Sequence, residues 1–516
     1  MGFSLLAVFV VPALSVPFVY LTGKKSPKAA AIFVALIALI NIILVLSTIP
    51  TILSNPDNLY LESYSWMSAV MDSSFTLFAD GISVSLALIS LVLILVTAIF
   101  SITYMAGKKH LASYYSLLCM LSVGLVGVFL TSNLVLFYLC WELMLVPAYF
   151  IVGEWGYKDS YRQAFKLFMY THAGAVFVLL GIGAIYWLTG TLDIFAAKDS
   201  LLTMAVSDAT KWILIAFTGG FAVKMAVFPV HMWLPDAHSE APAPMSALLS
   251  GVIISAGAYA ILRLSLGMIF PSVGLTFGTH FLYALSVIGV LSAFFGALIA
   301  LVSVDIKRLI AYSSISHMGY IMFGLSLFPV NSSTGLIVLM SSTIAITGTV
   351  LHIISHALSK GLLFIVAGAV MHQTKKRDIR KMGNLATKMP FTAVSATVAS
   401  LSIAGSPPFA CFVSEVLIFI GASQIMYLDT FYIIPTVLML IATILSLAYM
   451  LRFTWHVFLG RPKRDISTVI AAGKDVNKFD VSNWMKISFT ILVILILIVG
   501  IYPSLFTELI QTAKFG

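Results

Sequence analysis

The sequence predicts an all-α polytopic membrane protein with about fourteen transmembrane helices. Three observations predict it. The 516-residue chain is 60% hydrophobic and only 9% charged, a composition typical of membrane proteins. Apolar runs of about 20 residues recur between polar breaks, which is the length of a bilayer-spanning helix. The first apolar run, over residues 1–22, lacks a preceding basic segment, so we expect a first transmembrane helix and not a cleaved signal peptide.

The charged loops predict how these helices are oriented. Basic residues concentrate in the odd-numbered loops, whereas the even-numbered loops carry mostly acidic residues such as Asp57, Glu62, Asp72, Asp80, Asp193 and Asp208. This alternation predicts odd-numbered loops in the cytoplasm and both termini outside. It also accounts for most of the net charge of +9, so a nucleic-acid partner is not needed to explain it. The odd-loop basic residues are Lys24, Lys25, Lys28, Lys108, Lys109, Lys158, Arg162, Lys307, Arg308, Lys375, Lys376, Arg377, Arg380, Lys381, Arg461, Lys463 and Arg464.

Four ionisable residues stand near the centres of predicted helices: Glu142, Lys224, Lys360 and Glu415. A charge at mid-bilayer costs roughly 2.5 to 3.5 kcal/mol on insertion scales, so these side chains are expected to face the bundle interior. One interpretation is structural ion pairing of Glu142 with Lys224 and of Glu415 with Lys360. We favour a proton relay, because burial weakens the hold of a lysine on its proton and strengthens that of a carboxylate.

Prolines interrupt two of the helices that carry these charges. Pro229 follows Lys224, and Pro407 and Pro408 precede Glu415. A proline removes a backbone donor and frees a carbonyl, which an internal wet cavity tolerates and lipid does not. Broken helices at mid-membrane are a sequence indication of an ion site.

Histidines provide possible steps between the charges. His352, His356 and Lys360 have i, i+4, i+8 spacing, which places them on one stripe of a helix. Imidazole titrates near neutral pH and suits a proton relay, in which we include His317. For His172, a hydrogen-bonded packing role is favoured.

Neither a histidine-containing loop cluster nor the cysteines have the spacing expected of metal ligands. His231, Asp236, His238 and Glu240 lack a metal-ligand spacing, so the cluster is interpreted as a cytoplasmic polar gate. The cysteines have no C-x-x-C pattern and are expected to pack as small hydrophobic residues. They are Cys119, Cys140 and Cys411.

The stretches that carry these residues resemble a known family. "FAVKMAVFPVHMWLPDAHSEAPAPMSALLSG", "DIKRLIAYSSISHMGY", "HALSKGLLF" and "SLSIAGSPPFACFVSE" resemble the antiporter-like subunits of respiratory complex I, membrane-bound hydrogenases and multisubunit cation/proton antiporters. The resemblance runs from about residue 120 to 458. It implies fourteen helices with two inverted five-helix repeats, over 111–271 and 272–458, between three N-terminal helices (1–110) and a cytoplasmic loop with the last helix (459–516).

The resemblance also implies roles for residues and shows departures. It places Glu142 beside Lys224 in one half-channel, Lys360 as a central relay and Glu415 on the second broken helix. Many relatives carry a further relay lysine where this chain has Ser255. A lysine at position 360 resembles the longest antiporter-like subunit of complex I and the cation antiporters, whereas a glutamate at position 415 resembles a shorter antiporter-like subunit. The chain also ends without the long lateral helix of the longest subunit. These mixed features indicate a branch outside ordinary complex I.

We therefore predict an ion-translocating, proton-pumping membrane subunit of a multisubunit redox-driven complex in the cell membrane or an energy-transducing inner membrane. No cofactor motif is present, so iron-sulfur or nickel-iron centres are expected in partner subunits. One alternative is a redox-independent sodium/proton antiporter using oxygens of Glu142, Asp80 and Glu415. Another is a non-pumping structural subunit. The sequence leaves open the ion, the electron donor and acceptor, the stoichiometry and the position within the complex.

Overall fold

The computed structural model describes residues 4–55, 59–66, 74–329, 336–461 and 480–513. Four charged loop residues used to predict orientation, Asp57, Asp72, Lys463 and Arg464, lie outside the described residues. The main helices and strands are α1 (Leu5–Lys25), α2 (Pro27–Leu46), α3 (Ile49–Ser54), β1 (Tyr60–Ser65), β2 (Ser74–Ala79), α5 (Gly81–Tyr104), α6 (Leu111–Leu130), α7 (Leu134–Trp155), α8 (Ser160–Thr189), α9 (Ile194–Thr203), α10 (Asp208–Met225), α11 (Leu234–Glu240), α12 (Ala243–Leu248), η1 (Leu249–Ile253), α13 (Ile254–Ala260), η2 (Ile261–Ile269), α14 (Leu275–Val302), α15 (Ile306–Leu325), α16 (Leu336–Thr374), α17 (Pro390–Ile403), α18 (Ala410–Ile425), α19 (Ile433–Thr454), η7 (Trp455–Leu459), α21 (Asn483–Ile501) and α22 (Ser504–Gln511).

The prediction of a mostly helical, multi-pass membrane protein is confirmed. Within the described residues, eleven helices are long and apolar enough to cross a membrane. The remaining three predicted spans correspond to α10 with α11, to α15, and to α17 with α18. Two of these are broken at the predicted prolines, and α15 carries serines, a histidine and two basic residues that lower its hydropathy.

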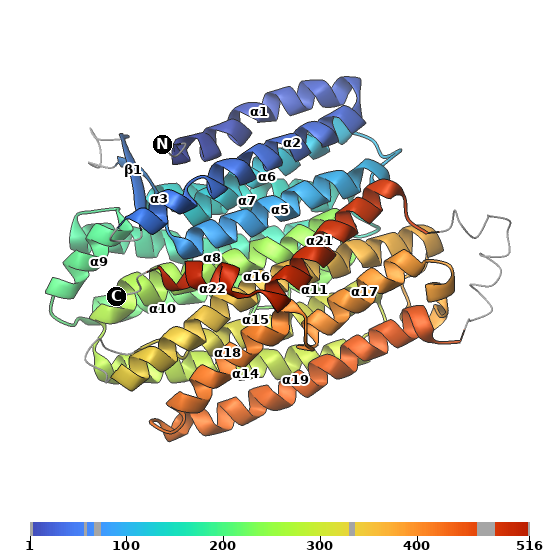
Figure 1. Ribbon diagram of the computed structural model, residues 1–516. Coiled ribbons are helices and arrows are strands. Elements are labelled where there is room, and N and C mark those ends of the chain that lie inside the picture. Colours follow the sequence, from blue (N-terminus) through green and yellow to red (C-terminus); the bar gives the residue numbers. More distant parts are fainter. Residues whose placement is uncertain (1–3, 56–58, 67–73, 330–335, 462–479, 514–516) are drawn as a thin grey trace.

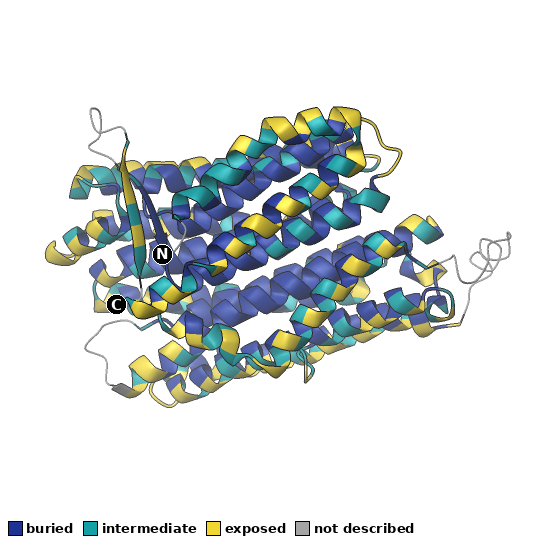
Figure 2. Ribbon diagram, turned by 45° about the horizontal axis from the view of Figure 1, so that its top comes forward, coloured by how far each residue is buried: buried dark blue, intermediate teal, exposed yellow. Residues whose placement is uncertain are grey.

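The long helices run side by side in one bundle (Figure 1). Helices α1 and α2 lie at one edge and α19 at the other, while α5 and α16 lie between them. Side chains are buried along the middle of the bundle and exposed on its outer helices (Figure 2). An exposed apolar surface of this kind suits a lipid environment.

The two ends of the bundle differ in charge. At one end β1 and β2 form an antiparallel hairpin in which Tyr60 pairs with Ala79, and both chain ends lie near it (Figure 1). The Glu62 carboxylate there accepts bonds from the Ser4 hydroxyl and the Leu5 amide, at 2.7 and 2.9 Å. The opposite end, which we call the basic end, carries Lys24, Lys108, Lys158, Arg308 and Arg377.

A buried ion pair joins the hairpin end to the centre of the bundle. Arg263 of η2 donates to the Asp80 carboxylate at 2.5 Å, and both side chains are less than a tenth exposed. The Arg263 guanidinium also lies over the rings of Phe78 and Tyr259, while Asp80 caps α5 through the Ser83 amide. The sequence analysis missed Arg263, although a lone arginine in an apolar run is a signal that could have identified it.

Replacing Arg263 by Met is expected to destabilise the protein by about 3 to 5 kcal/mol, because Asp80 is left as an uncompensated buried charge. The measurement is the free energy of unfolding in detergent micelles on titration with a denaturing detergent. The double variant Asp80→Asn/Arg263→Met should recover part of the loss. Equal stability of Arg263→Met and the parent protein would show that the pair contributes little.

Candidate functional site

Lys224 lies in the last turn of α10, directly before the first helix break. Its side chain is only 2% exposed. The ammonium donates to the Trp141 carbonyl at 2.9 Å and lies 3.9 Å from the centre of the Trp141 ring. At the break, the Val223 carbonyl accepts from the Ala226 amide at 3.2 Å and from the Trp233 indole at 2.9 Å. The broken helix thus places a cation inside the bundle without leaving this carbonyl unpaired.

Glu142, on the preceding span α7, is directed toward α8. Its Oε2 lies 3.2 Å from Nδ1 of His172, and its Oε1 has no hydrogen-bond partner among the described residues. His172 also stacks on Phe168. The sequence analysis assigned His172 to packing and missed its contact with Glu142, because helix spacing does not show which neighbouring helix a side chain meets.

The direct ion pairs of the alternative structural interpretation are not formed in this structure. Among the ion pairs of the described residues, neither Glu142 with Lys224 nor Glu415 with Lys360 occurs within 4 Å. Lys360, which is fully buried, instead donates to the Ser313 hydroxyl. The interpretation as static structural pairs therefore has no support from this conformation.

The second half of the site is a chain of hydrogen bonds through two imidazoles. The Ser414 hydroxyl donates to the Cys411 carbonyl at 2.9 Å, so it accepts from Nδ1 of His352, also at 2.9 Å. Nε2 of His352 then accepts from Nδ1 of His317 at 3.1 Å. Nε2 of His317 in turn accepts from the Tyr449 hydroxyl at 3.3 Å. Each imidazole in this arrangement is neutral, with one nitrogen donating and the other accepting.

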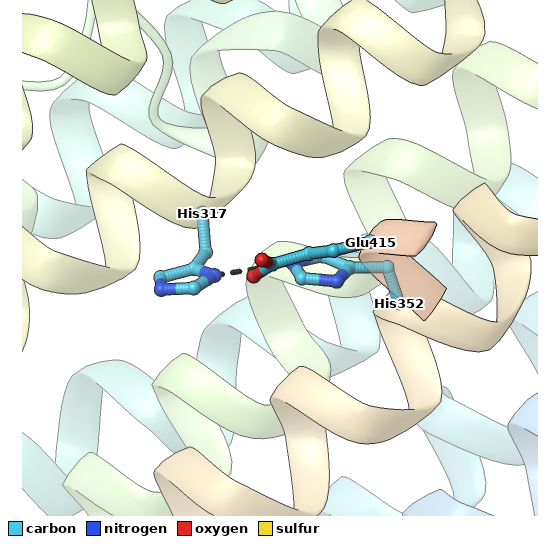
Figure 3. A group of neighbouring side chains, drawn as sticks. All are labelled: His317, His352 and Glu415. Carbon is cyan, nitrogen blue, oxygen red and sulfur yellow. Dashed lines mark hydrogen bonds between the residues drawn. The ribbon is translucent and has the colours of Figure 1, made fainter. Parts of the chain in front are cut away.

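Glu415 completes this cluster from the second broken helix. Its carboxylate extends toward the two imidazoles of His317 and His352 (Figure 3), and one potential ligand atom of each of the three residues lies within 4.8 Å of the others. Oε1 of Glu415 has no hydrogen-bond partner among the described residues. Two imidazoles and a carboxylate could ligate a metal ion, but the facing nitrogens of the two histidines already bond to each other.

The predicted stripe on α16 is placed on one buried helix face. His352, His356 and Lys360 are all fully buried. The His356 ring lies 5.9 Å from the His317 ring, and neither of its nitrogens has a partner among the described residues. Ser255, at the position where the family resemblance implies a lysine, donates to its own helix at the Gly251 carbonyl.

The four residues of the predicted polar gate occupy different environments. Asp236 bonds to Lys166 at 2.8 Å and to Arg308, within the ion pairs of the basic end. His231 and His238 are instead buried, and His238 stacks on Phe364 with no partner for either nitrogen among the described residues. Asp236 and Glu240, which bonds to Arg377 at 3.3 Å, thus match a polar rim.

Lys307, which the sequence analysis counted as a loop charge, is also fully buried. Its ammonium donates to the Ala241 carbonyl at 2.5 Å and faces the ring of Tyr157. Nearby, Arg377 bonds to Asp305 and Glu240 at 2.8 and 3.3 Å. Burial alone would lower the pKa of Arg377, but the two carboxylates raise it above its ordinary value.

These features define a class of membrane subunit in which broken helices carry charged side chains into a buried polar line. The family model described as NADH:quinone oxidoreductase/Mrp antiporter, TM, matches residues 131–444, and the chain belongs to that family. It is 32% identical over 503 residues to NADH-quinone oxidoreductase subunit M of Rickettsia conorii, covering 96% of this chain and 94% of the relative. The same subunit of Rhodobacter capsulatus is 32% identical over 473 residues, covering 89% and 84%.

Solved structures share the fold over nearly the whole chain. An archaeal membrane-bound sulfane sulfur reductase is similar with a TM-score of 0.82 and 28% identity, covering 98% of this chain and 77% of that one. Respiratory complex I from Thermus thermophilus gives 0.81 and 22%, covering 99% of both chains. The Mrp complex from Dietzia sp. gives 0.79 and 22%, covering 98% and 96%. The last two similarities show the fold alone.

Substituting Gly405 by Ala is expected to disturb the Glu415 carboxylate. Gly405 has a φ of +65°, and a Cβ there would collide with Oε2 of Glu415. Left-handed backbone strain adds about 1 to 2 kcal/mol, so both the free energy of unfolding and the ion-transport rate should fall. Gly183→Ala on α8 is the matched control, because a Cβ at Gly183 meets nothing within 4 Å. Equal effects of the two substitutions would contradict a specific role for Gly405.

Proposed function

We propose that this chain is a proton-translocating membrane subunit of a multisubunit respiratory redox complex related to complex I. The observation that carries the proposal is the set of ionisable side chains inside the spans, buried on α10, α16 and α18 and partly buried on α7, two of them beside helix breaks. The names of the curated relatives, which are subunits of NADH-quinone oxidoreductases, support it. Electron transfer belongs to partner subunits, in which iron-sulfur or nickel-iron centres are expected.

In the first half of the chain, Glu142 controls the proton on Lys224. When the carboxylate is close, it stabilises the ammonium; when it turns away, Lys224 remains in an apolar site and releases its proton more easily. The contact of Glu142 with His172 corresponds to the separated state. His172 is therefore the alternative partner of Glu142 in this proposal.

A partner subunit is expected to cover this switch. The side chains of Glu142 and His172 are 22% and 45% exposed within their spans. Contact with hydrocarbon would make this exposure costly. A polar or charged group on a neighbouring subunit would both cover the pair and provide a means of moving Glu142.

Between the halves, the proton crosses a region of hydroxyl groups. Helix α13 packs against both α10 and α16, and η1 packs against α16. Ser250 of η1 bonds to Ser314 at 2.7 Å, next to Ser313, the partner of Lys360. Since Ser255 replaces the relay lysine of relatives, water bridging these hydroxyls is expected to carry the proton toward Lys360.

In the second half, His352, His317 and Glu415 form the proton-loading cluster. A proton arriving by way of Lys360 and His356 is shared by the two imidazoles and passes to Glu415, from which it is released to the outside. The unpartnered nitrogens of His356 are expected to bind water, because buried polar groups rarely stay unsatisfied.

The proposal includes the finer topology. Fourteen spans, with inverted repeats over 111–271 and 272–458, would place one broken helix as the fourth span of each repeat. An even number of crossings is supported by both chain ends lying at the hairpin end (Figure 1). We propose that this end faces outside and that the basic end is cytoplasmic.

The alternative of a redox-independent sodium/proton antiporter has less support. Its candidate oxygen ligand Asp80 is occupied by Arg263, and Lys224 and Lys360 oppose a resting cation. The retained buried charges also argue against a purely structural subunit, because charges without a function are costly to keep in a membrane.

Lys224→Met should abolish proton pumping while the complex still assembles, because methionine retains much of the apolar stem but cannot carry a proton. The measurement is proton uptake per electron by the complex in vesicles. Lys211→Ala, near the start of the same helix, is the control and should pump normally. Unchanged proton uptake in Lys224→Met would overturn the proposed relay.

Tyr449→Phe should slow pumping about ten-fold, corresponding to roughly 1.4 kcal/mol in the barrier. The change removes the donor to Nε2 of His317 and leaves that imidazole free to reorient. The comparison is the rate of proton uptake in Tyr449→Phe and in Tyr283→Phe, a tyrosine bonded to Asp429 at 2.6 Å outside the cluster. A larger loss in the second variant would count against the hydrogen-bonded chain.

A further inference from the structure

A pocket of about 350 Å³ opens at the basic end of the bundle, where α5 and α16 end. None of the residues that line it is acidic, and more than half are basic or can become so. We call this site the basic pocket. Its lining residues are Tyr104, Lys108, Tyr157, Met371, His372, Lys375, Lys376 and Arg377.

Several cationic groups of this pocket retain free bonding capacity. The Lys108 ammonium donates to the Trp155 carbonyl at 2.8 Å, which leaves two of its three N–H groups. Among the described residues, no carboxylate pairs with Lys108, His372 or Lys375. Burial lowers the pKa of Lys108, and a bound anion would offset that effect.

The other groups give the pocket a polar and rigid wall. The hydroxyls of Tyr104 and Tyr157 bond to each other at 2.7 Å, and the Arg377 guanidinium lies over the Tyr157 ring. Arg377 is held by Asp305 and Glu240, which fixes its position beside the cavity. The carboxylates neutralise Arg377, so the positive charge available to a ligand comes mainly from Lys108 and Lys375.

We infer that the basic pocket binds a phosphate-bearing anion. A phosphate group presents several oxygens in a compact tetrahedron, so that Lys108, Lys375 and a tyrosine hydroxyl can donate to it together. A carboxylate offers fewer acceptors for the same set of donors. The phosphate can come from an anionic lipid headgroup at the membrane surface or from a soluble phosphate compound.

The test compares the intact complex carrying the parent chain with the variant Lys108→Ala/Lys375→Ala. Two probes are used at fixed ionic strength: retention of cardiolipin against phosphatidylcholine by native mass spectrometry, and binding of inorganic pyrophosphate by calorimetry. The control variant is Lys25→Ala/Lys381→Ala, which removes two exposed lysines from the same end but outside the pocket.

The pocket variant should bind the probe at least about ten-fold more weakly, because two charged donors are lost, while the control variant binds as the parent does. Loss of cardiolipin alone identifies a lipid headgroup, and loss of pyrophosphate alone identifies a soluble phosphate. The inference is overturned if the parent binds neither probe, or if both variants bind equally well. Normal assembly and pumping by the pocket variant would show that a loss of binding is not a loss of folding.

Discussion

The cost of placing charge where water is scarce determines much of this structure. Lys224, Lys360 and Glu415 are each almost completely buried, and none of them can be left in contact with hydrocarbon. Each is held inside the bundle, with a carbonyl, a hydroxyl or the histidine cluster near its charged group. The arrangement of the surrounding helices follows from keeping these groups both enclosed and chemically usable.

The helix breaks impose a similar requirement on the backbone, whose polar groups must also be satisfied inside the protein. An interrupted helix has unpaired amides and carbonyls, which must find partners inside the protein. At the first break, Trp233 donates to the Val223 carbonyl and the Ser292 hydroxyl accepts from the Phe228 amide at 2.9 Å. At the second, the glycine at position 405 leaves space for the Glu415 carboxylate. The openings beside the prolines are therefore filled by specific side chains, Ser292 from another helix and Trp233 and Glu415 from the broken spans themselves.

Hydropathy and charge predicted most of the fold and the principal members of the site. The positions of Lys224, Lys360 and Glu415 stand out because a charge in an apolar run is rare. The contact of Glu142 with His172 and the partnership of Arg263 with Asp80 were not predictable in this way. Both join segments whose rotation and tilt are set by tertiary packing, and spacing along one helix carries no information about the residue opposite.

Hydrogen-bond partners of common residue types could not be identified from the sequence either. Tyr449 and Ser414 belong to the hydrogen-bonded chain only because α19 and α18 bring them beside the imidazoles. Their residue types are common in membrane helices and give no signal alone. Lys307 was hidden for the opposite reason, because its place at a helix start suggested a solvated loop charge, although the structure buries it.

Helix α16 is uninterrupted over 39 residues, and at 1.5 Å per residue it forms a rod of about 58 Å. It carries His352, His356 and Lys360 in its middle and His372 near its end at the basic pocket. Because one continuous helix carries these residues, a small rotation of α16 about its axis at one end would reorient all of them together. Helix α16 therefore links the relay residues in the middle of the bundle mechanically to the basic pocket at its surface.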